Sequence, residues 1–138
     1  KVTIDNWDAV VAYERNTLWK KKVMKEAAVY IEKRKITNIK IANNFWTRFM
    51  GLMGKSPKQI ENMGGLLIKP CSQIHMFFMK TPIDVIYLNK NNEIIKIDSE
   101  VPTGICCKKV KGSKSVLELP SGYATKLGFN SKDRLEVV

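Results

Sequence analysis

The chain has 138 residues, a length that fits one domain able to bury a core without disulfides or a structural metal. No stretch approaches the roughly 20 apolar residues of a membrane-spanning helix. The formal net charge is +11, but residues 1–35 hold nine Lys or Arg against five Asp or Glu and residues 36–138 hold fifteen against eight. The excess is therefore spread over the chain, and no basic cluster interleaves aromatic residues, so the sequence does not predict specific nucleic-acid binding.

The first predicted element is a long amphipathic helix. From about Asp8 to Arg34 there is no Gly or Pro, and apolar residues recur at helical spacing. These residues are Val11, Leu18, Trp19, Val23, Ala27 and Ile31. Such a stripe packs on the domain or on a second copy of the chain, or lies on a partner or membrane surface. We therefore divide the chain into an N-terminal helical extension, residues 1–35, and a β-rich domain, residues 36–138.

After residue 35 the pattern changes to short strands and turns. A short helix is predicted over 45–53, and another begins at Ser56-Pro57, with Ser as its cap and Pro at its first position. A turn at 120–122 leads into a last short helix that ends at Gly128. Apolar runs predict strands at 39–41, 66–68, 74–79, 83–88, 94–97, 101–107, 116–119 and 134–138. The predicted fold class is α+β, with a compact, mostly antiparallel and barrel-like sheet, short helices and the N-terminal amphipathic helix.

Four segments carry a family signature in a fixed order. They are Phe-Trp-Thr-Arg-Phe-Met-Gly-Leu-Met-Gly at 45–54, Gly-Gly-Leu at 64–66, Phe-Met-Lys-Thr-Pro-Ile-Asp at 78–84 and Val-Leu-Glu-Leu-Pro-Ser-Gly at 116–122. Over residues 36–138 the chain resembles the prokaryotic family called domain of unknown function 192. The Pro-Cys-x-x-Ile-His segment at 70–75 looks like a subgroup of that family. A longer, Trp- and Asn-containing version of the Met-Lys segment is missing here, and residues 1–35 match no part of the family pattern.

The resemblance implies a compact, β-rich α+β fold and a bacterial or archaeal distribution. It also implies that many members have export signals and that the family has no established catalytic residue. It therefore describes the fold better than the activity.

Most of the candidate chemistry lies between residues 70 and 84. This segment holds Cys71, the chain's single histidine His75, and Asp84, which begins a strand that is apolar on both faces. A carboxylate there is expected to be buried, and a buried carboxylate needs a partner. The candidate partners are Arg48, Lys80 and His75. Asp84 is then either a structural acid, paired or capping backbone groups, or a functional carboxylate beside the histidine.

Cys71 and His75 are four residues apart, so they share one face of a strand or a helix. A structural zinc site has four ligands, and the sequence has no second histidine and no Cys-x-x-Cys pair, so we predict no metal and no cofactor. A thiolate with a histidine base also needs an orienting group and an oxyanion hole. A packed cysteine and a hydrogen-bonded histidine form the simpler interpretation.

Arg48 is the single cation in the apolar segment 45–53, so its guanidinium is expected to reach an acid, a carbonyl or a ligand. Glu118 alternates with two leucines and faces either solvent or a pocket. The methionines and phenylalanines of 50–79 are interpreted as core residues. The predicted ligand-binding cluster comprises Arg48, His75, Lys80, Asp84 and Glu118.

Two functions remain open. The first is a non-enzymatic binding or accessory module for a small polar or anionic ligand or a partner peptide, linked to the cell envelope or self-associating through the N-terminal helix. The second is a hydrolase or thiol-dependent enzyme that uses Cys71, His75 and Asp84. The three cysteines, two of them adjacent, favour a reducing, cytoplasmic compartment. A chain that starts at Lys1 is also what a trimmed, exported form would look like.

Overall fold

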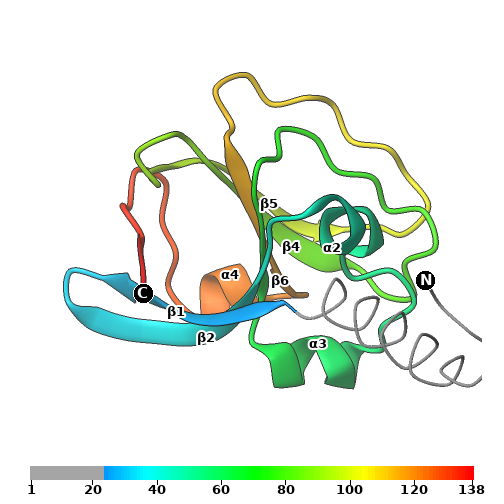
Figure 1. The fold of residues 1–138 in the computed structure, drawn as a ribbon, viewed down its shortest axis with the longest axis horizontal. Coiled ribbons are helices and arrows are strands. Elements are labelled where there is room, and N and C mark those ends of the chain that lie inside the picture. Colours follow the sequence, from blue (N-terminus) through cyan, green and yellow to red (C-terminus); the bar gives the residue numbers. More distant parts are fainter. Residues whose placement is uncertain (1–23) are drawn as a thin grey trace, which may run out of the picture.

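The computed structural model describes residues 24–138, which form a mixed sheet of seven strands with a few short helices (Figure 1). The strands are β1 (Lys25–Ile31), β2 (Arg34–Ala42), β3 (Leu66–Ile68), β4 (Ile83–Leu88), β5 (Ile94–Val101), β6 (Ser115–Pro120) and β7 (Glu136–Val137). The helices are α2 (Phe45–Met50), α3 (Pro57–Met63) and α4 (Tyr123–Lys126). Across the sheet the order is β5-β4-β6-β3-β2-β1-β7, with β2 and β3 parallel and the other pairs antiparallel. No helix within residues 24–138 is long and apolar enough to cross a bilayer.

The last part of the expected N-terminal helix is a strand. β1 pairs with β2 and β7, and its residues Val29 and Ile31 are buried in the core. Ala27 and Ile31 are four residues apart, a spacing that fits a strand face as well as a helix face. The division at residue 35 therefore falls inside the β1–β2 hairpin. The rest of the expected helix, with its proposed contacts to a partner, lies outside the described residues.

The short helices begin where their capping residues predict. Ser56 caps α3 and forms a capping box with Gln59, and Asn44 and Thr47 form the same arrangement on α2. Gly64 ends α3 in the left-handed conformation, where a Cβ would collide with the carbonyl oxygen of Asn38. This close approach explains the glycine that precedes β3.

Two of the expected strands, 74–79 and the region around 105, do not join the sheet. Instead they pair with each other outside it, through a bridge between His75 and Cys106 (Figure 1). The N–H of Met76 donates to the carbonyl of Ile105 at 2.7 Å, and the N–H of Val110 donates to the carbonyl of Ser72 at 2.8 Å.

The sheet is not closed into a barrel, contrary to the barrel-like expectation. β5 and β7 form its two edges, and a single bridge between Glu93 and Arg134 connects the segments next to them. β7 pairs with β1 and not with β5, so the sheet stays open.

Hydrophobic cores lie on both faces of the sheet. One core contains Ile86 and Leu117 with Ala124 of α4, and the other contains Tyr87 and Val116 with Ile60 of α3. Figure 1 shows α4 and α2 on opposite sides of the β4–β6 region. The fully buried strands β4 and β6 are apolar on both faces for this reason.

Asp84 lies in β4, is fully buried, and faces α4. Its Oδ2 accepts the N–H of Ala124 in the first turn of α4 at 2.8 Å, and its Oδ1 accepts the N–H of Glu100 at 2.8 Å. The α4 cap residue, Gly122, provides no side-chain hydrogen bond, so Asp84 satisfies a helix N–H from a distant strand. Asp84 is therefore a structural acid that binds backbone groups, and neither Arg48 nor Lys80 pairs with it.

We expect Asp84→Ala to lower the free energy of unfolding by about 3 kcal/mol, because the buried N–H of Ala124 and the partly buried N–H of Glu100 lose their acceptor. Urea denaturation followed by circular dichroism measures this loss. Asp98→Ala is the matched control on neighbouring β5, where Asp98 pairs with an exposed Lys96 at 3.4 Å and contributes less than about 1 kcal/mol. Equal midpoints for the Asp84 variant and the unmodified chain would contradict this role.

Candidate functional site

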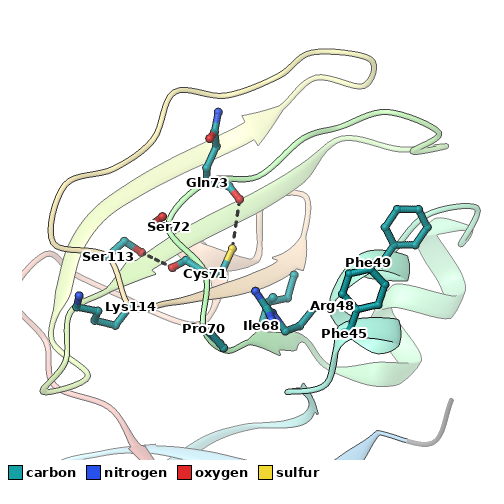
Figure 2. A pocket seen from close by; sticks show the side chains of 10 residues that line it. All are labelled: Phe45, Arg48, Phe49, Ile68, Pro70, Cys71, Ser72, Gln73, Ser113 and Lys114. Carbon is teal, nitrogen blue, oxygen red and sulfur yellow. Dashed lines mark hydrogen bonds between the residues drawn. The ribbon is translucent and has the colours of Figure 1, made fainter. Parts of the chain in front are cut away.

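The first candidate site is a groove of about 530 Å³ between α2 and the segment that follows β3 (Figure 2). We call it the α2 groove. Figure 2 shows side chains of α2 on one side, Cys71, Ser72 and Ser113 on the other, and Ile68 and Pro70 between them. It is lined by Phe45, Arg48, Phe49, Ile68, Pro70, Cys71, Ser72, Gln73, Ser113 and Lys114.

Backbone and side-chain hydrogen bonds fix the wall opposite α2. The hydroxyl of Ser113 donates to the carbonyl of Cys71 at 3.0 Å, and the N–H of Cys71 donates to the carbonyl of Lys114 at 3.0 Å. The amide of Gln73 donates to the carbonyl of Cys107 at 2.8 Å. This wall is therefore held in place before any ligand binds.

Arg48 projects from α2 across the groove toward Cys71 (Figure 2). Within residues 24–138, its guanidinium has neither a carboxylate within 4.0 Å nor a hydrogen bond to a protein group. The two aromatic residues beside it, Phe45 and Phe49, are 79% and 57% exposed and stack with ring centroids 6.3 Å apart. The groove thus combines an unpaired cation with accessible aromatic surface.

A smaller cavity of about 70 Å³ lies beside the groove, and we call it the Glu118 chamber. Arg48, Phe49, Ile68, Cys71 and Gln73 line both spaces, and Gly51, His75, Met79 and Glu118 are among the residues that line the chamber alone. Glu118 comes from β6, opposite Val85 of β4 and Leu66 of β3.

Glu118 is 5% exposed, and no described residue donates a hydrogen bond to its carboxylate or forms an ion pair with it. Burial disfavours the charged form and raises the pKa of Glu118 to about 7. An unpartnered buried carboxyl group is rare and requires an explanation. At neutral pH this side chain is poised between an acid and a carboxylate.

The structure brings together only part of the predicted cluster. Arg48, His75 and Glu118 share the Glu118 chamber with Cys71. Asp84 faces α4, on the opposite side of the sheet from Glu118, because Asp84 is paired with Leu119 in the β4–β6 ladder. Lys80 is exposed and lines neither cavity.

Cys71 and His75 make separate contacts, with no hydrogen bond between them. The thiol of Cys71 donates to the carbonyl of Gln73 at 3.3 Å, and burial raises the pKa of Cys71. His75 is exposed and stacks on Phe77, with centroids 5.3 Å apart. Within residues 24–138, no three His, Cys, Asp or Glu side chains are grouped to hold a metal ion.

Sequence reasoning missed the aromatic surface of the groove. The sequence predicts an apolar helix over 45–53 but gives no role to Phe45 and Phe49, and Thr47 is the buried residue of α2. Phe77 and Phe78, expected in the core, are 45% and 83% exposed. The four-residue spacing of Phe45 and Phe49 was a signal, because it places both on one face of a helix.

We expect Glu118→Gln to flatten the pH dependence of stability. The folded chain keeps the Glu118 proton up to about pH 7, whereas the unfolded chain loses it near pH 4.3, so this group lowers the free energy of unfolding as pH rises between these values. The variant cannot ionise, so its stability relative to the unmodified chain should rise by about 3 kcal/mol from pH 4 to pH 8. Urea titrations across this range measure the change.

Glu61→Gln, at an exposed glutamate of α3, is the control and should follow the unmodified chain at every pH. A Glu118 variant with the same pH profile as the unmodified chain would show that the Glu118 carboxyl is hydrated.

We expect iodoacetamide to modify Cys106 before Cys71 in the native chain. Cys106 is exposed, whereas Cys71 is partly buried with a raised pKa, so less of its thiolate is present and less is accessible. Mass spectrometry of peptides after brief labelling measures the order. Preferential labelling of Cys71 would restore the thiol-enzyme hypothesis.

The sequence of this chain is similar to those of known proteins. The profile of DUF192, described as an uncharacterised family, matches residues 27–137. A UPF0127 protein of Pyrococcus furiosus is 31% identical over 103 residues, covering 71% of this chain and 84% of that protein, and one of Thermococcus sibiricus is 33% identical over 103 residues, covering 71% and 64%.

Solved structures share this architecture. A protein of unknown function from Novosphingobium aromaticivorans superposes with a TM-score of 0.67 at 17% identity, covering 82% of this chain and 84% of that one. A putative transcription regulator from Sinorhizobium meliloti superposes with a TM-score of 0.65 at 20% identity, covering 84% of this chain and 95% of that one. At such identities the likeness concerns the fold alone. With a profile match over most of its length, the chain belongs to the DUF192 (UPF0127) family of uncharacterised proteins.

Proposed function

We propose that this domain is a non-enzymatic binding module that holds a small ligand with an acidic group in the α2 groove. The observation that carries the proposal is the guanidinium of Arg48, which projects into the groove without a partner among the described residues. Arginine matches the planar, two-oxygen geometry of a carboxylate or phosphate. Phe45 and Phe49 supply an apolar surface for the rest of the ligand.

The enzyme alternative receives less support. A hydrolase built on Cys71, His75 and Asp84 needs the three side chains in contact, but Asp84 serves the opposite face of the sheet. The Cys71 thiol has a raised pKa, the reverse of what an activated nucleophile requires. A binding module needs none of these features.

We also propose that the Pro-Cys-x-x-Ile-His segment marks a subgroup of the family with its own ligand preference. Pro70, Cys71 and the two residues that follow them line the α2 groove directly. A change of sequence in this segment would therefore alter one wall of the binding space.

Benzoate is a suitable probe because it carries one carboxylate on an aromatic ring. We expect it to shift the backbone amide resonances of residues 45–49 and 70–73 in a heteronuclear NMR titration, and we expect benzyl alcohol, which lacks the charge, to bind at least tenfold more weakly. Arg48→Gln should weaken benzoate binding by about tenfold or more, because a charge-assisted hydrogen bond contributes about 1.5–3 kcal/mol.

Lys58→Gln is the matched control: it removes an exposed cation of α3 that lines neither the α2 groove nor the Glu118 chamber, and benzoate affinity should stay unchanged. Equal affinity for benzoate in the Arg48→Gln variant and the unmodified chain, or equal binding of benzyl alcohol, would refute an anion-binding groove.

A further inference from the structure

Glu118 is a buried acid of the candidate site that the proposed function leaves without a role. Its side chain is 5% exposed, it has no hydrogen bond or ion pair from residues 24–138, and it lines a cavity that shares walls with the α2 groove. If this side chain only filled space, an apolar side chain of the same size would make the folded chain more stable, because it needs no partner when buried. Its position therefore points to a partner that enters from the groove.

The location of the carboxyl group limits what that partner can be. A Cβ placed on Gly51 would lie 3.9 Å from Oε1 of Glu118, so the carboxyl group lies directly below the turn that ends α2. The chamber of about 70 Å³ has room for a few waters or one small polar group, but not for a whole ligand. A ligand of the α2 groove could therefore place only one small end group in the chamber.

The charges of the two spaces are complementary. Arg48 borders both the groove and the chamber, and Glu118 lies in the chamber more than 4.0 Å from any described Lys, Arg or His nitrogen. Arg48 and Glu118 line the same chamber, and neither has a protein partner among residues 24–138, so this cation and this acid suit a molecule that carries the opposite pair of charges. An ammonium group pairs with a desolvated carboxylate far better than a neutral donor does.

We propose that the ligand of the α2 groove is an amino acid-like zwitterion, whose acidic group binds Arg48 and whose primary ammonium group enters the chamber and binds Glu118. This inference rests on the proposed function, because the ligand's acidic group must first occupy the groove. Because burial raises the pKa of Glu118 to about 7, its carboxyl group is mostly protonated in the free protein at pH 6. On binding, the ammonium keeps its three protons, the Glu118 proton leaves for the solvent, and an ammonium–carboxylate pair forms.

The test compares 4-aminobutanoate, 5-aminopentanoate and 6-aminohexanoate with butanoate, pentanoate and hexanoate by calorimetry on the full chain. At pH 8 we expect at least one amino acid to bind tenfold or more tightly than its matched fatty acid. In Glu118→Gln the gain from the amine should fall below threefold. Glu61→Gln, at an exposed acid outside both cavities, should keep the full gain.

Proton release gives a second readout. At pH 6, titration in two buffers of different ionisation enthalpy should show about one proton released per amino acid bound, and none per fatty acid. Arg48, Cys71 and His75 also line the chamber, and Tyr87 and Cys107 lie near Glu118, so the release must disappear in Glu118→Gln. Release that persists in this variant would show that a group other than Glu118 loses the proton and would refute its role.

The outcomes separate the two proposals. If benzoate binds through Arg48 but no amino acid gains over its fatty acid, the α2 groove binds anions and the role of Glu118 is refuted, with water as its partner. If neither benzoate nor any amino acid binds, both proposals fail. If the amino acids bind but Glu118→Gln keeps the full gain, the ammonium group binds elsewhere.

Discussion

Two hydrogen bonds to one buried carboxylate connect three parts of this fold. Asp84 lies opposite an irregular step in the β4–β5 ladder, where Ile83 pairs with Val101 and Val85 pairs with Asp98. The extra residue, Glu100, has a positive φ of 51°, and its N–H donates to Asp84. The second oxygen takes the N–H of Ala124. The bulge of an edge strand and the start of α4 are therefore held by the same central strand.

Successive residues of a strand face opposite sides of the sheet, so the two buried acids of β4 and β6 lie on different faces. Asp84 and its cross-strand neighbour Leu119 point toward α4, so Val85 and its neighbour Glu118 must point the other way. One acid is satisfied by backbone groups and stabilises the fold. The other acid, one register position away, has no partner among the described residues. Two carboxyl groups in adjacent ladder positions thus have different surroundings.

Much of the architecture could be predicted from local pattern. Ser56-Pro57 and Gly64 mark both ends of α3, and the apolar runs at 66–68, 83–88 and 116–119 are strands, because capping chemistry and two-sided burial leave clear local signals. The failures involve long-range contacts. Residues 25–31 have a spacing that fits both helix and strand, and their pairing with β2 and β7 decides between them.

The site was predictable only in part, for a related reason. Arg48, His75 and Glu118 were singled out because each is an ionisable residue among apolar neighbours, and all three line the Glu118 chamber. The local sequence could not indicate that Asp84 and Glu118 face opposite sides of the sheet. In a strand that is apolar on both faces, the elements that pack on each face decide this, and they are distant in the sequence. The sequence also could not indicate that α2 buries Thr47 and leaves Phe45 and Phe49 exposed. Which face of α2 is buried depends on the parts of the domain that pack against it, and these lie far away in the sequence.

The pairing of residues 71–76 with 104–110 has a consequence for how this family diversifies. That pairing depends on main-chain hydrogen bonds, such as those from Met76 to Ile105 and from Val110 to Ser72, and it lies outside the sheet. Side chains on its groove side can therefore be exchanged while the main-chain ladder persists and the sheet keeps its own core. The domain resembles an antibody framework in this respect: a rigid scaffold carries a segment whose side chains can be replaced. If the α2 groove binds a ligand as proposed, grafting variants of residues 70–73 onto this scaffold would give binders of new small molecules.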